Sequence, residues 1–164
     1  MSDLFDVRGG TITLAKAILT GLSGTAKTIS YTGNPLFALG GRLYTGDTCS
    51  GGSLQTTDFL TGDAFLPLAN GKQCLFVFGW ESDGTWEVIQ GPIVNTADVI
   101  NTADTLRFPS IPDTFCPFAY VSIKNANATS WLFATGNWDA SDLTVGTVID
   151  CSLLIPQPLT DASA

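Results

Sequence analysis

Short apolar runs recur along this chain about every ten residues, and clusters of glycine, proline, asparagine and aspartate separate them. The runs either alternate apolar with polar residues or are apolar throughout, and no helical period continues beyond Leu19. Such alternation is typical of half-buried strands, and the clusters between the runs favour turns. The sequence therefore predicts an all-β fold, an antiparallel β-sandwich that is jelly-roll-like, with about eight strands.

The length of 164 residues suits one domain with a single core. We expect residues 1–10 to form an N-terminal arm, because this stretch ends in a break of two glycines. Residues 11–164 are then expected to form a single β-sandwich domain. Besides two hairpins, the expected elements are strands over residues 11–19, 26–31, 36–44 and 148–155, a short strand or turn over 59–68, and an exposed loop over 45–57.

The clearest element is a hairpin made by Cys74–Trp80 and by the strand that follows it, Thr85–Ile89. Asp83-Gly84 between them is a strong signal for a two-residue turn, because both residues tolerate the positive φ that such turns need. In that register Trp86 covers Gly79 diagonally. Both faces of the first strand are apolar, which predicts a central strand that is buried on both sides.

A second hairpin is expected from Pro117–Lys124 and Ser130–Phe133, with Asn125–Thr129 as its turn. A short tandem duplication, residues 95–100 and 101–106, is expected to form two similar turns capped by asparagine and aspartate. The duplication lacks the glycine and the bidentate glutamate of an EF-hand loop, so we expect no metal ion there.

Histidine is absent, and the only glutamates are Glu81 and Glu87, beside the Asp83-Gly84 turn. Without histidine, the Ser/His/Asp and Cys/His catalytic constellations are excluded. In the expected register Trp80 lies opposite Glu87, so the two glutamates point to opposite faces and make a poor acid/base pair. No phosphate-binding glycine loop is present. We predict that the protein is not an enzyme and has no catalytic residues and no cofactor.

The formal net charge is −8, and the seven basic residues are scattered. No basic stripe is present that would bind phosphates, so we expect no nucleic-acid partner. The mean hydropathy is positive, yet no apolar run reaches the roughly 20 residues of a membrane span. We therefore expect no membrane contact, and a homo-oligomer that buries the surplus apolar surface.

The four cysteines, Cys49, Cys74, Cys116 and Cys151, are too widely separated for a zinc knuckle or a CxxC redox motif. Cys74 and Cys151 lie inside apolar strand patterns. We expect all four thiols to be reduced.

Tryptophan is the one residue type here that favours a ligand. An exposed tryptophan stacks on sugar rings, whereas a buried one fills a core or an interface. Among Trp80, Trp86, Trp131 and Trp138, the last lies in a polar loop and is the best candidate for exposure.

The segment Cys116–Asn125, followed by Phe133–Leu143, resembles a pattern in small virion proteins of tailed bacteriophages. In that pattern a proline-led aromatic strand precedes a polar hairpin, a Phe-x-x-Gly step and a short acidic loop. An apolar hairpin with an Asp-Gly turn often lies upstream. The resemblance covers about half of the chain, Cys74–Leu143.

What the resemblance implies is a head decoration, or cement, protein. Such proteins are β-rich and often trimeric, and they brace the major capsid protein on the capsid exterior. The first residues lack a secretory signal, so we expect synthesis in the host cytoplasm. We predict Leu4, Phe5 and Val7 of the arm, together with Trp138, as partner contacts. The alternative is a head-fibre or tail component whose β-sandwich binds carbohydrate on a receptor.

Overall fold

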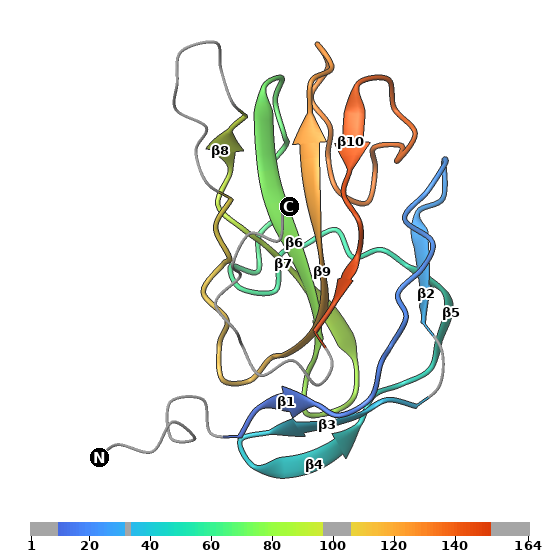
Figure 1. Ribbon diagram of the computed structural model, residues 1–164, viewed down its shortest axis with the longest axis vertical. Helices are drawn as coiled ribbons and strands as arrows, with labels where there is room; N and C mark the ends of the chain where they lie inside the picture. Colours follow the sequence, from blue (N-terminus) through green and yellow to red (C-terminus); the bar gives the residue numbers. More distant parts are fainter. Residues whose placement is uncertain (1–9, 32–33, 97–105, 152–164) are drawn as a thin grey trace, which may run out of the picture.

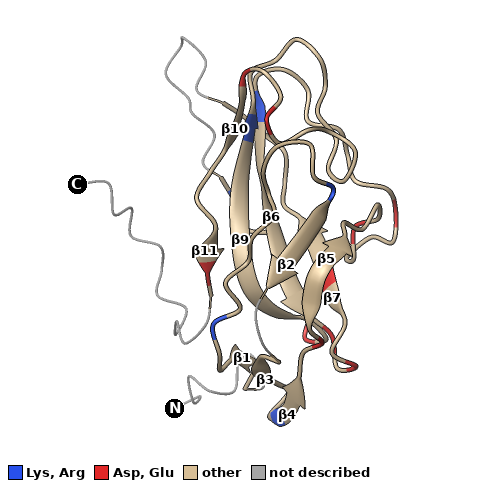
Figure 2. Cartoon of the chain, turned by 90° about the vertical axis from the view of Figure 1, so that its right-hand side faces the viewer, with Lys and Arg blue, Asp and Glu red and all other residues tan. Residues whose placement is uncertain are grey.

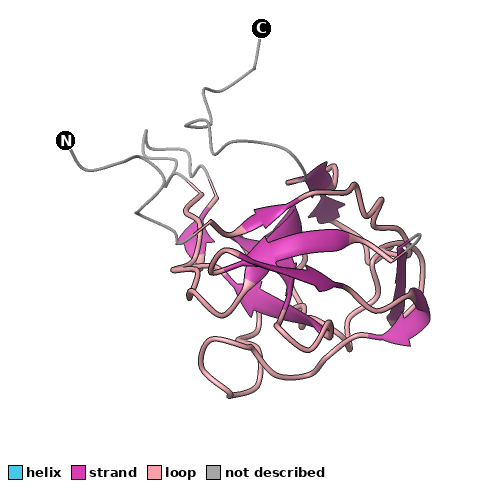
Figure 3. Ribbon diagram, turned by 90° about the horizontal axis from the view of Figure 1, so that it is seen from below, coloured by secondary structure: helices cyan, strands magenta, loops and turns pink. Residues whose placement is uncertain are grey.

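The computed structural model describes residues 10–31, 34–96 and 106–151, and these residues form strands and loops without any helix (Figures 1 and 3). Every strand pairing among them is antiparallel. The all-β class and the antiparallel pairing predicted from the sequence are therefore confirmed. The described residues form eleven strands, several of them only two residues long, where about eight were expected.

The largest sheet has the strand order β10-β9-β6-β7. Its strands β6 and β9 run along the long axis of the molecule (Figure 1). Two short strands extend it: β8 pairs with β6, and β11 pairs with β9. Its members are β6 (Lys72–Trp80), β7 (Trp86–Gln90), β8 (Val94–Asn95), β9 (Cys116–Asn125), β10 (Leu143–Val145) and β11 (Ile149–Asp150).

Strand β6 is buried on both faces, as its continuous apolar sequence predicts. Phe76, Phe78 and Trp80 belong to the large core on one face of the sheet. On the other face Val77 packs in a smaller cluster with Phe115. Alternation along the strand thus divides its side chains between two cores.

The β6–β7 hairpin has a longer turn than the sequence predicts. The Glu81 amide donates to the Thr85 carbonyl at 3.0 Å, and the Gly84 amide donates to the Glu81 carbonyl at 3.0 Å. Gly84 has a φ of 90°. This is a three-residue loop in which glycine takes the left-handed position. The expected two-residue turn is therefore wrong, and Trp80 lies opposite Trp86 rather than Glu87.

A shift of one residue changes which side chains share a face. Gly79 now lies opposite Glu87, so Glu81 and Glu87 are on the same face of the hairpin, not on opposite faces. The ring over Gly79 is Phe115, not Trp86. A Cβ at Gly79 would lie 2.3 Å from Cε1 of Phe115, so only glycine allows this close approach.

A three-stranded sheet, in the order β1-β3-β4, lies below the main sheet in Figure 1. It consists of β1 (Ile12–Thr13), β3 (Leu36–Leu39) and β4 (Arg42–Thr45). The expected strand over 36–44 is thus a hairpin, because Gly40 and Gly41 both have positive φ and form its turn. The expected strand over 11–19 is reduced to β1.

A two-stranded sheet pairs β2 (Thr28–Tyr31) with β5 (Cys49–Ser53). Strand β2 confirms the strand predicted there. Strand β5 lies within the stretch that was predicted to be an exposed loop, so that prediction is wrong. Glycine and serine do not exclude a strand when a partner strand supplies the hydrogen bonds.

The second predicted hairpin is also wrong. Strand β9 pairs with β10 and β6, whereas Trp131 makes an isolated bridge to Leu68. The short strand or turn expected over residues 59–68 is a turn, in which the Gly62 amide donates to the Asp58 carbonyl at 2.8 Å. The turns predicted for the tandem duplication lie largely outside the described residues.

Candidate interaction surfaces

Trp138, the predicted exposed tryptophan, is buried with 4% of its surface exposed. Its ring packs edge-on against Trp131, with centroids 5.1 Å apart, and against Phe133 at 5.8 Å. The Trp138 amide donates to the Gly24 carbonyl at 2.9 Å, which ties the loop over the core. The polar neighbours in sequence face outward while the indole faces inward. The prediction of exposure is therefore wrong.

The other predicted contact residues, Leu4, Phe5 and Val7, lie outside the described residues. Among the residues that the structure does describe, no group of three or more His, Cys, Asp or Glu side chains is placed to hold a metal ion. In the same residues no helix is long and apolar enough to cross a membrane.

The outer face of the β1-β3-β4 sheet is an apolar surface that the sequence analysis missed. The register places Ile12, Ala38 and Leu43 side by side in one row. Leu14 donates its amide to the Leu36 carbonyl at 2.9 Å and so lies beside Leu36 in the next row. Leu14, Leu36 and Leu43 are 40%, 43% and 63% exposed. We call these five residues the outer sheet face.

The inner face of the same sheet packs against the core, so the outer face is the one that remains uncovered. Phe37 stacks on Trp80 with centroids 5.4 Å apart, and on Tyr44 at 5.6 Å. Thr13 donates to the Pro117 carbonyl at 2.9 Å. The core is therefore filled from the inner face, and the same short strands carry apolar residues outward as well. The outer sheet face is therefore a candidate interaction surface.

A second apolar surface lies beside β7, at the edge of the main sheet. It is a groove of about 480 Å³ whose apolar lining comes from Leu60, Leu66, Pro92, Ile93 and Pro109. Leu60 is 45% exposed and Leu66 is 64% exposed. We call it the β7 groove.

Hydrogen bonds to β7 hold both walls of this groove. The buried Asp58 carboxylate accepts the amides of Leu60 at 2.7 Å and of Gln90 at 2.6 Å. The Gln90 side chain accepts from the Leu66 amide at 2.8 Å and donates to the Leu66 carbonyl at 2.9 Å. The side chains of Asp58 and Gln90 thus fix the backbone of Leu60 and Leu66, whose own side chains stay exposed.

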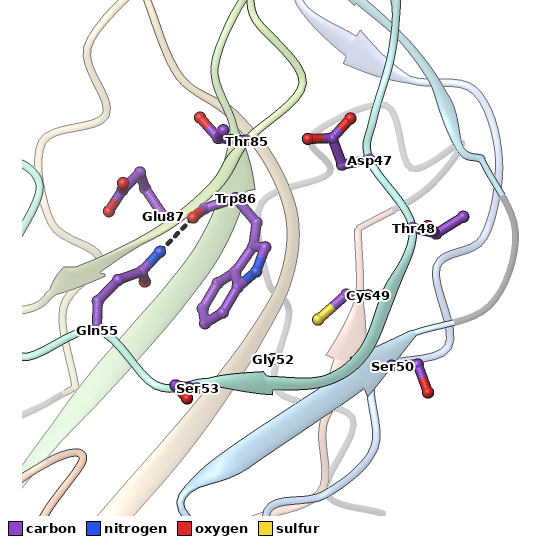
Figure 4. Close-up of a pocket in the computed structure, with 10 residues that line it drawn as sticks. All are labelled: Asp47, Thr48, Cys49, Ser50, Gly52, Ser53, Gln55, Thr85, Trp86 and Glu87. Carbon is purple, nitrogen blue, oxygen red and sulfur yellow. Dashed lines mark hydrogen bonds between the residues drawn. The ribbon is translucent and has the colours of Figure 1, made fainter.

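A third hollow, of about 420 Å³, lies between β5 and β7 (Figure 4). The half-buried Trp86 indole points into it beside Cys49 and Gly52, and the Gln55 amide donates to the Trp86 carbonyl. A Cβ at Gly52 would lie 2.6 Å from Sγ of Cys49, so the glycine leaves room for the Cys49 side chain, whereas the same Cβ would lie at an ordinary contact distance of 3.6 Å from Nε1 of Trp86. Of the four tryptophans, Trp80, Trp131 and Trp138 are buried and Trp86 is half-buried.

Acidic residues lie near the lower end of β7 in Figure 2, the end at which the third hollow lies. Asp47 and Glu87 line it. Burial raises the pKa of Glu87, and the nearby charges of Glu81 and Asp83 raise that pKa further. The hollow therefore combines an aromatic surface with hydrogen-bond acceptors and negative charge.

The four cysteines are free thiols, and Cys49, Cys74 and Cys116 are buried. Burial raises the pKa of Cys74 to about 12 and that of Cys116 to about 11. Burial also raises the pKa of Cys151 to about 12, with the nearby Asp150 charge adding to the effect. These groups are inert thiols at neutral pH, because the thiolate is the reactive form.

The free energy of unfolding should fall as the pH rises from about 9 toward 12. In the unfolded protein, Cys74, Cys116 and Cys151 release their protons near the ordinary thiol pKa of 9.0, whereas the folded protein retains these protons until a higher pH. Urea unfolding midpoints between about pH 8 and pH 11 measure this loss. A Cys74→Ala variant should start less stable and lose stability less steeply with pH. An equal slope in the variant and the parent would contradict the assignment.

Comparisons with protein-family models, with curated proteins and with solved structures found no match.

Proposed function

We propose that this protein is a structural virion protein of a tailed bacteriophage, a capsid decoration protein that acts through protein–protein contacts. The observation that carries the proposal is the outer sheet face, an apolar surface left uncovered in a single copy. Burying apolar surface contributes roughly 25 cal/mol per Å². Leu36 and Leu43 expose apolar surface on a sheet whose inner face is already packed. A partner can therefore bury this surface without first having to order the strands.

The proposed partners are the major capsid protein and further copies of this chain, most simply in a trimer. The net charge of −8 suits a protein on the capsid exterior, away from packaged DNA. The basic residues are few and scattered along the sequence, which supports the same location, because the sequence offers no basic stripe for phosphates. Leu4, Phe5 and Val7 stay predicted contacts of the arm.

Binding to emptied capsids tests this proposal directly. The protein should sediment with capsids of its phage. Leu43→Lys should reduce the bound fraction at least about ten-fold, because a charged side chain in an apolar contact loses its hydration without gaining a partner. Thr144→Lys is the matched control, since Thr144 is exposed on β10 in a different sheet. A parent protein that ignores capsids would overturn the proposal.

The second candidate is the head-fibre or tail component that binds carbohydrate. The Trp86 hollow favours it, because a half-buried indole beside Gln55 and Asp47 has the elements of a sugar site. Host surface polysaccharide should then quench tryptophan fluorescence, and Trp86→Ala should abolish the binding heat. Quenching with no capsid binding would select this candidate over the decoration protein.

A further inference from the structure

We propose that Asn70 is a modification site, at which the chain deamidates through attack by its own backbone. Among the asparagines of the sequence, Asn70 alone precedes a glycine. Gly71 has no side chain that would hinder its own amide nitrogen, so this step of the chain is the one most prone to the reaction. The reaction requires no partner and is therefore independent of the proposed capsid binding.

The reaction conserves atoms and consumes only water. The backbone nitrogen of Gly71 loses its proton and attacks Cγ of Asn70, so that a new C–N bond forms and the side-chain amide leaves as ammonia. The product is a cyclic succinimide. Water then opens the ring at either of its carbonyls and gives aspartate or isoaspartate. An amide and a water molecule have become a carboxylic acid and ammonia, and nothing has been oxidised or reduced.

The local structure leaves the attacked side chain free to react. Asn70 is exposed in the turn that leads into β6, which the Lys72 amide closes by donating to the Ala69 carbonyl at 3.2 Å. Gly71 has a φ of 72°, the positive value that a type II turn needs at its third residue. No described residue forms a hydrogen bond with the Asn70 side chain, so its rotamers are unrestrained.

Hydrogen bonds on both sides of Gly71 oppose the reaction in the folded state. The Gly71 amide donates to the carbonyl of the completely buried Asn125 at 2.8 Å. The Gly71 carbonyl accepts from the Thr96 amide at 2.8 Å and from the Thr96 hydroxyl at 3.1 Å. We call these hydrogen bonds the Gly71 clamp. While the clamp is closed, the nitrogen keeps its proton and points at Asn125. Deamidation therefore proceeds only when this end of β6 opens.

The product should weaken the same end of the sheet. Isoaspartate adds one carbon to the main chain immediately before Gly71, which displaces Gly71 from Asn125 and Thr96. The reaction also adds a carboxylate to a chain whose formal net charge is already −8. A molecule that has reacted thus loses the Gly71 clamp and is expected to unfold more readily, because buried groups of the clamp are left without partners.

Other asparagines in the described part of the chain provide internal controls. Asn34 precedes Pro35, whose nitrogen has no proton to lose. Asn127 precedes an alanine, and its side chain is held at both ends. Its amide nitrogen donates to the Ser141 carbonyl at 2.7 Å, and its amide oxygen accepts from the Thr129 amide at 2.8 Å. We expect both asparagines to stay unmodified while Asn70 reacts.

Peptide mapping by mass spectrometry, during incubation of the full chain at mildly alkaline pH, tests the proposal. Asn70 should convert before any other asparagine, with isoaspartate among the products. The conversion should be at least about ten-fold slower in the folded chain than in the urea-unfolded chain, because the folded chain must first open. Asn70→Ser should abolish this conversion and keep the fold, which circular dichroism checks.

Thr96→Ala tests the Gly71 clamp itself, because it removes one hydrogen bond and leaves the reacting residues unchanged. It should accelerate the conversion in the folded chain roughly five-fold and leave the rate in urea unchanged. Thr144→Ala, at an exposed position on β10, is the matched control and should change neither rate. Equal rates in the folded and unfolded chains, an unchanged rate in Thr96→Ala, or earlier conversion of another asparagine would overturn the proposal.

Discussion

Trp80→Ala is expected to lower the free energy of unfolding by about 3–5 kcal/mol. Trp80 is fully buried, and its ring stacks on Phe118 with centroids 4.1 Å apart. Its indole nitrogen donates to the Tyr31 hydroxyl at 3.2 Å. Truncation leaves a cavity where the main sheet, the β1-β3-β4 sheet and β2 meet, and it leaves a buried hydroxyl without its donor.

Urea unfolding monitored by far-UV circular dichroism measures this loss. Trp86→Ala is the matched control, because Trp86 lies directly opposite Trp80 in the hairpin and is only half-buried. It should cost less than half as much. Equal losses for the two variants would show that the ring stack around Trp80 is not the centre of the core.

Asn125→Ala is expected to cost about 2–4 kcal/mol, because each buried polar group left without a partner costs roughly 1–3 kcal/mol. Asn125 is completely buried at the end of β9. Its amide nitrogen donates to the Leu68 carbonyl at 2.7 Å and to the Thr129 carbonyl at 3.0 Å. Its amide oxygen accepts from the Asn127 amide at 2.9 Å.

Two further variants make this prediction specific. Asn125→Asp keeps the acceptor and loses the donors, so it should be as damaging as alanine at neutral pH. Asn127→Ala removes the same side chain from a partly exposed position nearby and should cost under about 1 kcal/mol, since water replaces the lost partners. A harmless Asn125→Ala would show that the Leu68 segment is held by other contacts.

The sequence determined the fold class and the elements whose signal is local. The continuous apolar run of β6 predicted a strand buried on both faces, and the structure places it between two cores. Strand β2 and the existence of the β6–β7 hairpin were predicted for the same reason. Period-two patterning and turn residues act through neighbours in the chain, so they are visible without a tertiary structure.

Register and pairing depended on more than the local pattern. Asp83-Gly84 is compatible with both a two-residue and a three-residue loop, and Phe115, which covers Gly79, comes from a segment far along the chain. Strand β9 pairs with β10, β11 and β6 rather than with the adjacent residues 130–133. Long-range packing selected among alternatives that the local sequence allows.

The candidate surfaces, too, follow partly from the sequence and partly from the tertiary structure. Composition predicted surplus apolar area, but not its place, because residues 12, 14, 36, 38 and 43 share one face only after β1 pairs with β3 and β3 with β4. Polar neighbours suggested that Trp138 is exposed, whereas its loop folds inward through a bond to Gly24. Apolar content is set by the sequence alone. Which apolar side chains face water is decided by the tertiary structure, because the β1-β3-β4 sheet packs only its inner face on the core, whereas β6 has cores on both faces.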